Sequence, residues 1–93
     1  MTEDAGVRRP VTIINQRGLH ARAAARLAKL AEGFECNIMV HGNGLSVSAL
    51  SIMGLMLLGA GPGTIIEISA TGAQAEAGVT AVIALVEARF DED

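Results

Sequence analysis

The chain has almost no aromatic side chains: it contains no tryptophan, no tyrosine and two phenylalanines among 93 residues. Proteins that recognise unpaired nucleotides commonly stack the bases on aromatic rings, which this chain does not supply. The net charge of −3 also disfavours bulk nucleic-acid binding. A nucleic-acid partner is therefore not expected, and the core must be built from closely packed small and aliphatic residues.

Cysteine and long apolar runs are also scarce. Cys36 is the only cysteine, so no internal disulfide can form, which is typical of a reducing compartment. The first residues are polar and lack the apolar stretch of a signal peptide. The most apolar run, Ile52 to Ala60, is interrupted by two glycines and is far shorter than the roughly 20 residues of a membrane span. We therefore expect a cytoplasmic protein without membrane insertion.

What is present indicates one globular domain. Hydrophobic residues make up 51% of the chain and charged residues 18%, a balance typical of a folded domain and not of a disordered segment. The length allows one core, and no linker or internal repeat divides the sequence. We expect a flexible tail over residues 1–7, a single domain over residues 8–93 and a monomer.

The charges are unevenly distributed along the chain. Residues 1–29 hold six of the seven cations and two of the ten acids, a net charge of +4. Residues 30–93 hold one cation and eight acids, a net charge of −7. A basic segment in a weakly acidic protein indicates that it binds a small anionic group or an acidic partner surface.

Hydrophobic periodicity predicts seven elements in the order βαββαβα. Strands are predicted over 11–14, 36–41, 45–49 and 64–70, and helices over 19–32, 52–58 and 75–90. The glycine-rich turn at 42–44 predicts a hairpin between the second and third strands. The fold class is an α/β two-layer sandwich, with a four-stranded antiparallel sheet whose one face is covered by helices and whose other face is open to water.

No metal or cofactor site is expected. His20, Cys36 and His41 lie in three different predicted elements without ligand spacing. The glycine-rich loop at 59–63 lacks the lysine and hydroxyl residue of a phosphate-binding P-loop, and a strand follows it instead of a helix.

His20 stands where a polar turn meets a predicted helix, within the segment GLHAR at 18–22. The free amides at a helix start stabilise an anion, and neutral imidazole is a competent nucleophile near neutral pH. A phosphoryl group on this ring would meet those amides and the guanidinium of Arg22. Arg22, Arg26 and Lys29 share one helix face, where cations oppose the helix dipole, so an anion or an acidic partner would explain them. The alternative is that His20 only caps the helix and that the cations form a solvated face.

Ser51 occupies the cap position of the short apolar helix predicted at 52–58. That helix has no polar face, so we expect one side in the core and the other, including Met53, exposed to a partner. The alternative is that Ser51 is a plain helix cap.

Three segments of the chain resemble the HPr family, the histidine-phosphorylated carriers of the bacterial phosphoenolpyruvate:sugar phosphotransferase system. They are GLHAR at 18–22, SIMG at 51–54 and GTII at 63–66. The resemblance covers residues 8–90 and implies an open-faced β-sandwich. It also implies Nδ1 phosphorylation of His20 assisted by Arg22, and regulation at Ser51. Many members have proline where this chain has Ala23 and lysine where it has Leu50, features that resemble nitrogen-related or regulatory members.

The resemblance implies that the protein is a phosphoryl carrier with a phosphohistidine intermediate, not a turnover enzyme. Its partners would be Enzyme I, a IIA domain and, for Ser51, an HPr serine kinase/phosphorylase. The competing classes are a non-catalytic regulator that needs no transfer chemistry and an RNA-binding module. The residues expected to dock partners are Leu19, Ala21, Arg26, Lys29, Ile52, Met53 and Met56.

Overall fold

The computed structural model describes residues 6–92. Over this range the strands are β1 (Val7–Thr12), β2 (Asn37–Gly42), β3 (Leu45–Ser48) and β4 (Ile65–Thr71). The α-helices are α1 (Ala21–Ala31), α2 (Ile52–Leu57) and α3 (Ala75–Glu87), and a short turn of 3-10 type, η1 (Arg89–Asp91), follows α3. The predicted order βαββαβα is confirmed.

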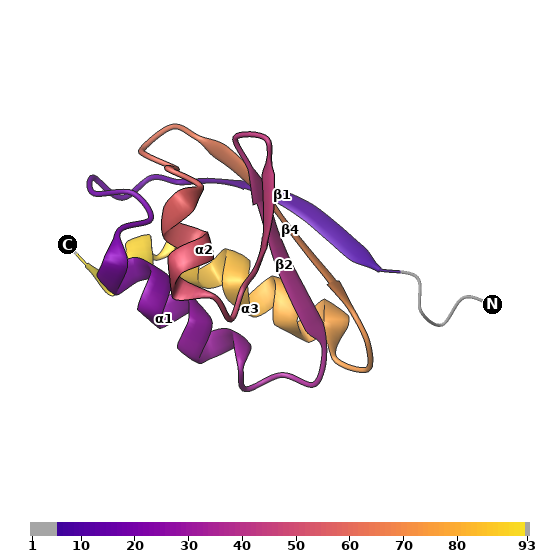
Figure 1. Cartoon of the computed structure of the whole chain (residues 1–93). Coiled ribbons are helices and arrows are strands. Elements are labelled where there is room, and N and C mark those ends of the chain that lie inside the picture. Colours follow the sequence, from indigo (N-terminus) through magenta and orange to yellow (C-terminus); the bar gives the residue numbers. More distant parts are fainter. Residues whose placement is uncertain (1–5, 93) are drawn as a thin grey trace.

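The sheet has the strand order β1-β4-β2-β3, and every neighbouring pair is antiparallel. All three α-helices lie on the same side of the sheet, and α1 and α2 pack against each other (Figure 1). The other face carries no helix in the described part of the chain. The two-layer, open-faced sandwich predicted from the sequence is therefore confirmed.

The core lies between the sheet and the helices. Alternate residues of β4 and β2 point into it, among them Ile66, Ile68 and Val40, each 0% exposed. The buried face of α1 consists mostly of alanines around Leu27, which lets this helix pack closely against α2 and α3. Small residues thus replace aromatic bulk, as the composition requires.

The first strand begins earlier than predicted. β1 starts at Val7, not Val11, and Pro10 lies within it, paired with Glu67 of β4. Proline is tolerated there because β1 is an edge strand and the missing N–H breaks no central hydrogen bond. The predicted tail over residues 1–7 falls mostly on residues 1–5, which lie outside the described residues.

The last helix is shorter than predicted. It ends at Glu87 instead of Phe90, and after Ala88 the residues 89–91 have left-handed backbone φ values of 57°, 55° and 60°. This conformation costs non-glycine residues about 1 to 2 kcal/mol each. The turn places the Phe90 ring in the core at 0% exposure, and burying such a ring contributes about 1.5 to 3 kcal/mol. Phe90 therefore lies in η1 and not in the last turn of the predicted helix.

No helix within residues 6–92 is long and apolar enough to cross a membrane.

Candidate functional site

His20 is the N-cap residue of α1. Its backbone is extended (φ −80°, ψ −178°), and its side chain turns back over the helix start. There the Arg22 N–H donates to Nδ1 of the ring at 3.2 Å. The ring is half-buried, with 15% of the side chain exposed. The prediction that this histidine stands where the polar turn meets the helix is confirmed.

A carboxylate binds the opposite side of the same ring. Oε2 of Glu92 lies 2.5 Å from Nε2 of His20. Because Nδ1 accepts from Arg22, it holds a lone pair, and the ring proton must therefore lie on Nε2, which donates to Glu92. The hydrogen bond from His20 holds the pKa of the Glu92 carboxyl below its ordinary range, against an upward effect of burial that is second in size. Asn15 and Arg17 lower this pKa further, by smaller amounts. Glu92 is thus an ionised acceptor near neutral pH.

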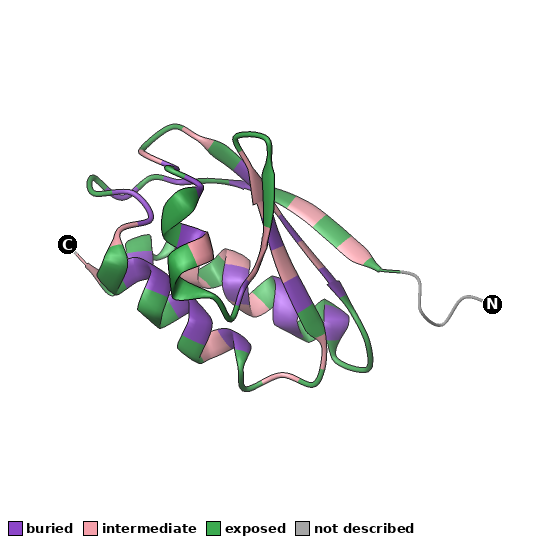
Figure 2. Cartoon of the chain, viewed as in Figure 1, coloured by how far each residue is buried: buried purple, intermediate pink, exposed green. Residues whose placement is uncertain are grey.

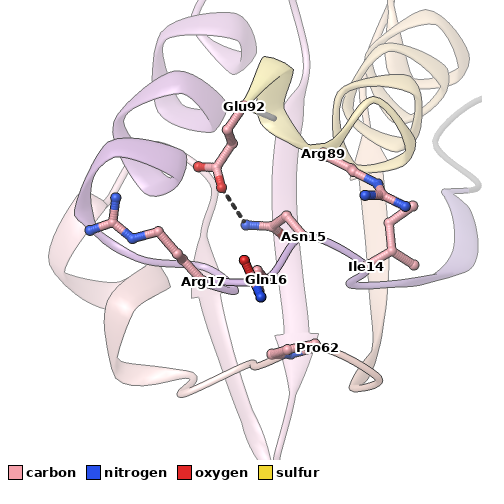
Figure 3. Close-up of a pocket in the computed structure, with 7 residues that line it drawn as sticks. All are labelled: Ile14, Asn15, Gln16, Arg17, Pro62, Arg89 and Glu92. Carbon is pink, nitrogen blue, oxygen red and sulfur yellow. Dashed lines mark hydrogen bonds between the residues drawn. The ribbon is translucent and has the colours of Figure 1, made fainter.

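Asn15 holds this carboxylate from below. Its Nδ2 donates to Oε1 of Glu92 at 3.2 Å, drawn as a dashed line in Figure 3, and to the carbonyl of Gly18 at 2.8 Å. Asn15 is 2% exposed, the one buried polar residue in residues 6–92. A pocket of about 540 Å³ opens beside it, with the guanidinium groups of Arg17 and Arg89 on opposite sides (Figure 3). Sequence reasoning missed both Asn15 and Glu92.

Gly18 allows the turn that carries His20 to pack against a second loop. Its φ is +65°, and a Cβ at this position would lie 2.4 Å from the carbonyl oxygen of Ala60. The next residue, Leu19, donates its N–H to that same oxygen at 2.9 Å. Glycine is required here both by the left-handed backbone and by the close approach.

The three cations of α1 are all exposed, but only one of them is bonded within residues 6–92. The Arg22 and Lys29 side chains form no hydrogen bond or ion pair within residues 6–92, and both residues are exposed. Arg26, in contrast, donates to the carbonyl of Phe90 at 3.1 Å and lies 3.6 Å from the carboxylate of Asp91. Arg26 therefore anchors the turn after α3, which is a structural reason for a cation at that position.

The predicted docking residues divide into exposed and buried ones. Leu19 is 5% exposed and belongs to the core, so its side chain cannot contribute to a docking surface and that expectation is wrong. Ala21 is exposed beside His20. On α2, as expected, Leu55 is buried while the outer side is exposed (Figure 2). We call this outer side, together with the residue before Ser51, the α2 patch; its exposed apolar residues are Leu50, Ile52, Met53, Met56 and Leu57.

Ser51 is the N-cap of α2, as predicted, and its hydroxyl accepts the N–H of Gly54 at 2.9 Å. A Cβ on Gly54 would lie 3.0 Å from that hydroxyl and 3.1 Å from Cβ of Val47. Glycine at position 54 thus lets the hydroxyl and β3 approach the helix. Ser51 is exposed, so its hydroxyl is accessible to a modifying enzyme.

The other two residues considered for metal binding lie elsewhere. His41 is on the open face of β2, where its ring bonds the hydroxyls of Ser46 at 2.8 Å and Ser69 at 2.7 Å. Burial, and then the charge of Arg8, lower the pKa of His41. Burial raises the pKa of the Cys36 thiol. No group of three potential ligands that could hold a metal ion occurs in residues 6–92.

Comparison with known proteins shows which family the sequence resembles. The family model described as "PTS HPr component phosphorylation site" matches residues 7–88. The phosphocarrier protein NPr of Shewanella violacea is 45% identical, covering 90% of this chain and 92% of that protein. The phosphocarrier protein HPr of Cupriavidus necator is 42% identical, covering 92% and 97%. The crystal structure of HPr from Thermoanaerobacter tengcongensis superimposes with a TM-score of 0.88 at 37% identity, covering 94% and 98%.

Proposed function

This chain belongs to the HPr family, the phosphocarrier proteins of the phosphotransferase system, and from that premise we propose that His20 is the residue that carries the phosphoryl group. The observation that carries the proposal is the state of its ring. Nδ1 holds a lone pair directed at the start of α1, because the Arg22 N–H donates to it. This nitrogen is the nucleophile, and it already lies among the amides that would bind the phosphoryl oxygens.

In the proposed reaction, Nδ1 of His20 attacks the phosphorus atom presented by Enzyme I. The bond between phosphorus and Enzyme I breaks, and its electron pair stays with Enzyme I. The Arg22 N–H, released from Nδ1, then donates to a phosphoryl oxygen, and the exposed Arg22 guanidinium balances the charge of the group in transit. Transfer to a IIA domain repeats these steps with His20 as the leaving group.

Position 23 adds a donor that many relatives lack. Proline is common there in the family, whereas Ala23 keeps a backbone N–H. The first N–H of α1 to bond back along the chain is that of Ala24, which donates to the carbonyl of His20 at 2.8 Å. The Ala23 N–H precedes it and belongs to the first turn, whose amides point toward a bound anion. We expect it to contribute to holding the phosphoryl group.

Docking would use the surface around His20 together with the α2 patch. Met53 is 75% exposed and Leu57 is 70% exposed. Because neighbouring exposed apolar side chains commonly mark an interaction site, the patch favours a partner contact. Phosphorylation of Ser51 by an HPr serine kinase/phosphorylase would place negative charge at the edge of this patch and weaken docking. We expect the protein to act in the cytoplasm as a monomer.

The test is incubation with phosphoenolpyruvate and Enzyme I, followed by intact-mass measurement. The wild-type protein should gain one acid-labile phosphoryl group, and His20→Ala should gain none. His41→Ala is the matched control, because its histidine lies on the open sheet face, and it should label like the wild type. Absence of label on the wild type, or equal labelling of His20→Ala, would refute the carrier function and favour a non-catalytic regulator.

A further inference from the structure

We propose that Glu92 is a positioning residue for phosphoryl transfer: its carboxylate keeps the ring proton of His20 on Nε2, so that Nδ1 remains the phosphoryl acceptor. The proposal rests on the function proposed above and on the contact of 2.5 Å between Oε2 of Glu92 and Nε2 of His20. With the Arg22 N–H on Nδ1, both nitrogens of the ring have a partner, and the two partners demand the same tautomer.

Glu92 reaches the ring because the chain turns sharply after α3, which places η1 beside α1 (Figure 1). Three successive left-handed residues make this turn. Such a conformation persists only where its surroundings hold it. The buried Phe90 ring holds it from within, and Arg26 holds it from α1 by binding the Phe90 carbonyl.

Asn15 also holds the Glu92 carboxylate in position. Its amide is buried and donates to both Oε1 of Glu92 and the carbonyl of Gly18. One amide group thus ties the carboxylate to the turn that carries His20, and the orientation of the carboxylate is fixed relative to the ring. A carboxylate held in this way orients an imidazole more firmly than a mobile surface side chain does.

The carboxylate would assist transfer in both directions. When Nδ1 bonds to phosphorus while Nε2 keeps its proton, the ring becomes positively charged, and the ionised Glu92 stabilises that charge. When the phosphoryl group leaves for an acceptor, the N–P electron pair returns to Nδ1 and the ring departs as neutral imidazole, still protonated on Nε2. No proton is exchanged with solvent in either step, so the same tautomer is ready for the next cycle.

The partial burial of His20 and Glu92 strengthens the interaction between them. Only 15% of the His20 side chain and 24% of that of Glu92 are exposed, so the pair is less screened than a surface ion pair. The other charged groups around Glu92 are Arg17 and Arg89, which line the adjacent pocket, and Asp91, which forms an ion pair with Arg26. Arg17 favours the ionised form of the Glu92 carboxyl, which stays in place as the partner of His20.

The first experiment reads the tautomer without any partner protein. Two-dimensional NMR of the histidine ring nitrogens should show His20 protonated on Nε2, with a proton that exchanges slowly with water. In Glu92→Ala that proton should exchange at least about tenfold faster. Glu87→Ala removes an exposed glutamate at the end of α3 and should leave the signal unchanged. A wild-type ring protonated on Nδ1, or a signal unaffected by Glu92→Ala, would overturn the proposal.

The second experiment measures phosphorylation by Enzyme I. Glu92→Gln keeps the shape of the side chain and removes its charge, so kcat should fall about tenfold while KM for Enzyme I changes less than about twofold. Glu87→Gln should match the wild type. If the wild type is labelled and Glu92→Gln retains the full kcat, only the role of Glu92 is wrong. If the wild type is not labelled at all, the carrier function itself fails, and the role of Glu92 in transfer fails with it.

Discussion

The starts of α1 and α2 use the same backbone device in different chemical surroundings. Each helix begins with a side chain that accepts a hydrogen bond from an amide of the first turn. At α2 the acceptor is the Ser51 hydroxyl, bound to Gly54 at 2.9 Å. At α1 it is a ring nitrogen of His20, bound to Arg22 at the longer distance of 3.2 Å. The cap of α1 is thus the weaker one.

The surroundings determine what each cap can do. The His20 ring is bonded to the Arg22 N–H and to the Glu92 carboxylate, which the buried Asn15 amide supports. In the proposed function this ring releases the Arg22 amide and takes up the phosphoryl group. Ser51 adjoins the apolar α2 patch and has no charged side chain bonded to it within residues 6–92. A phosphate can be accommodated at either helix start, but only the His20 region offers groups that would assist its transfer. The Ser51 region is suited to controlling docking.

The largest difference between the regions should come from Arg22→Ala. This substitution removes the exposed guanidinium two residues after His20 and should lower the rate of phosphoryl transfer roughly tenfold to a hundredfold. It should leave the melting temperature unchanged or slightly higher, because the cation opposes the α1 dipole and repels Arg26. Stopped-flow transfer and thermal unfolding of the same variant would test both. A large loss of stability with unchanged transfer would show that Arg22 is structural.

Ser51→Asp should mainly affect docking. The added charge is tolerated by the start of α2, so the fold should be kept, but KM for Enzyme I should rise about tenfold, equivalent to about 1.4 kcal/mol of binding free energy. Ser51→Ala, which loses the cap at a cost of about 1 kcal/mol in stability, should keep a wild-type KM. Equal, unchanged KM values for both variants would leave Ser51 as a plain helix cap.

A charge in the middle of the α2 patch should have a smaller effect. Met53→Glu should raise KM for Enzyme I about fivefold without unfolding the domain, since Met53 is 75% exposed. Ile65→Glu is the matched control, because Ile65 is also an exposed apolar residue, at 65%, but lies on the open sheet face. If both variants weaken binding equally, the α2 patch is not the docking surface.

The smallest effect should be the pH dependence of stability contributed by Glu92. Its pKa in the folded protein is held below the ordinary value of 4.5, chiefly by the hydrogen bond from His20. The ionised carboxylate therefore stabilises the fold fully above the unfolded-state pKa, and this contribution is lost as the pH falls through the lower folded-state pKa. Between pH 7 and about pH 3 the melting temperature of the wild type should fall more than that of Glu92→Gln. Parallel decreases would mean that the contact does not stabilise the ionised form.

Local sequence signals predicted much of the fold and part of the site. The alternation along β4 and the alanine spacing of α1 are periodic over a few residues, so they identified strands, helices and core faces directly. The cap position of Ser51 was equally local, because a cap depends on the residues that follow it within one turn. The start of α1 was predicted two residues too early, at Leu19 instead of Ala21. Strand and helix ends were less accurate, as Val7 and Glu87 show, because they depend on which neighbour the chain meets.

By itself, the sequence determined the element order, the Ser51 cap of α2 and the family to which the chain belongs. The tertiary structure alone decided that Glu92 meets His20 across a separation of 72 residues, that Arg26 anchors the turn at Phe90, and that Leu19 is buried. None of these contacts produces a periodic pattern in the sequence. A single glutamate or asparagine stands in the same sequence whether its side chain is solvated or hydrogen-bonded to a distant residue. Contacts between distant residues exist only once the sheet and helices have packed, and the groups that surround the His20 ring are of this kind.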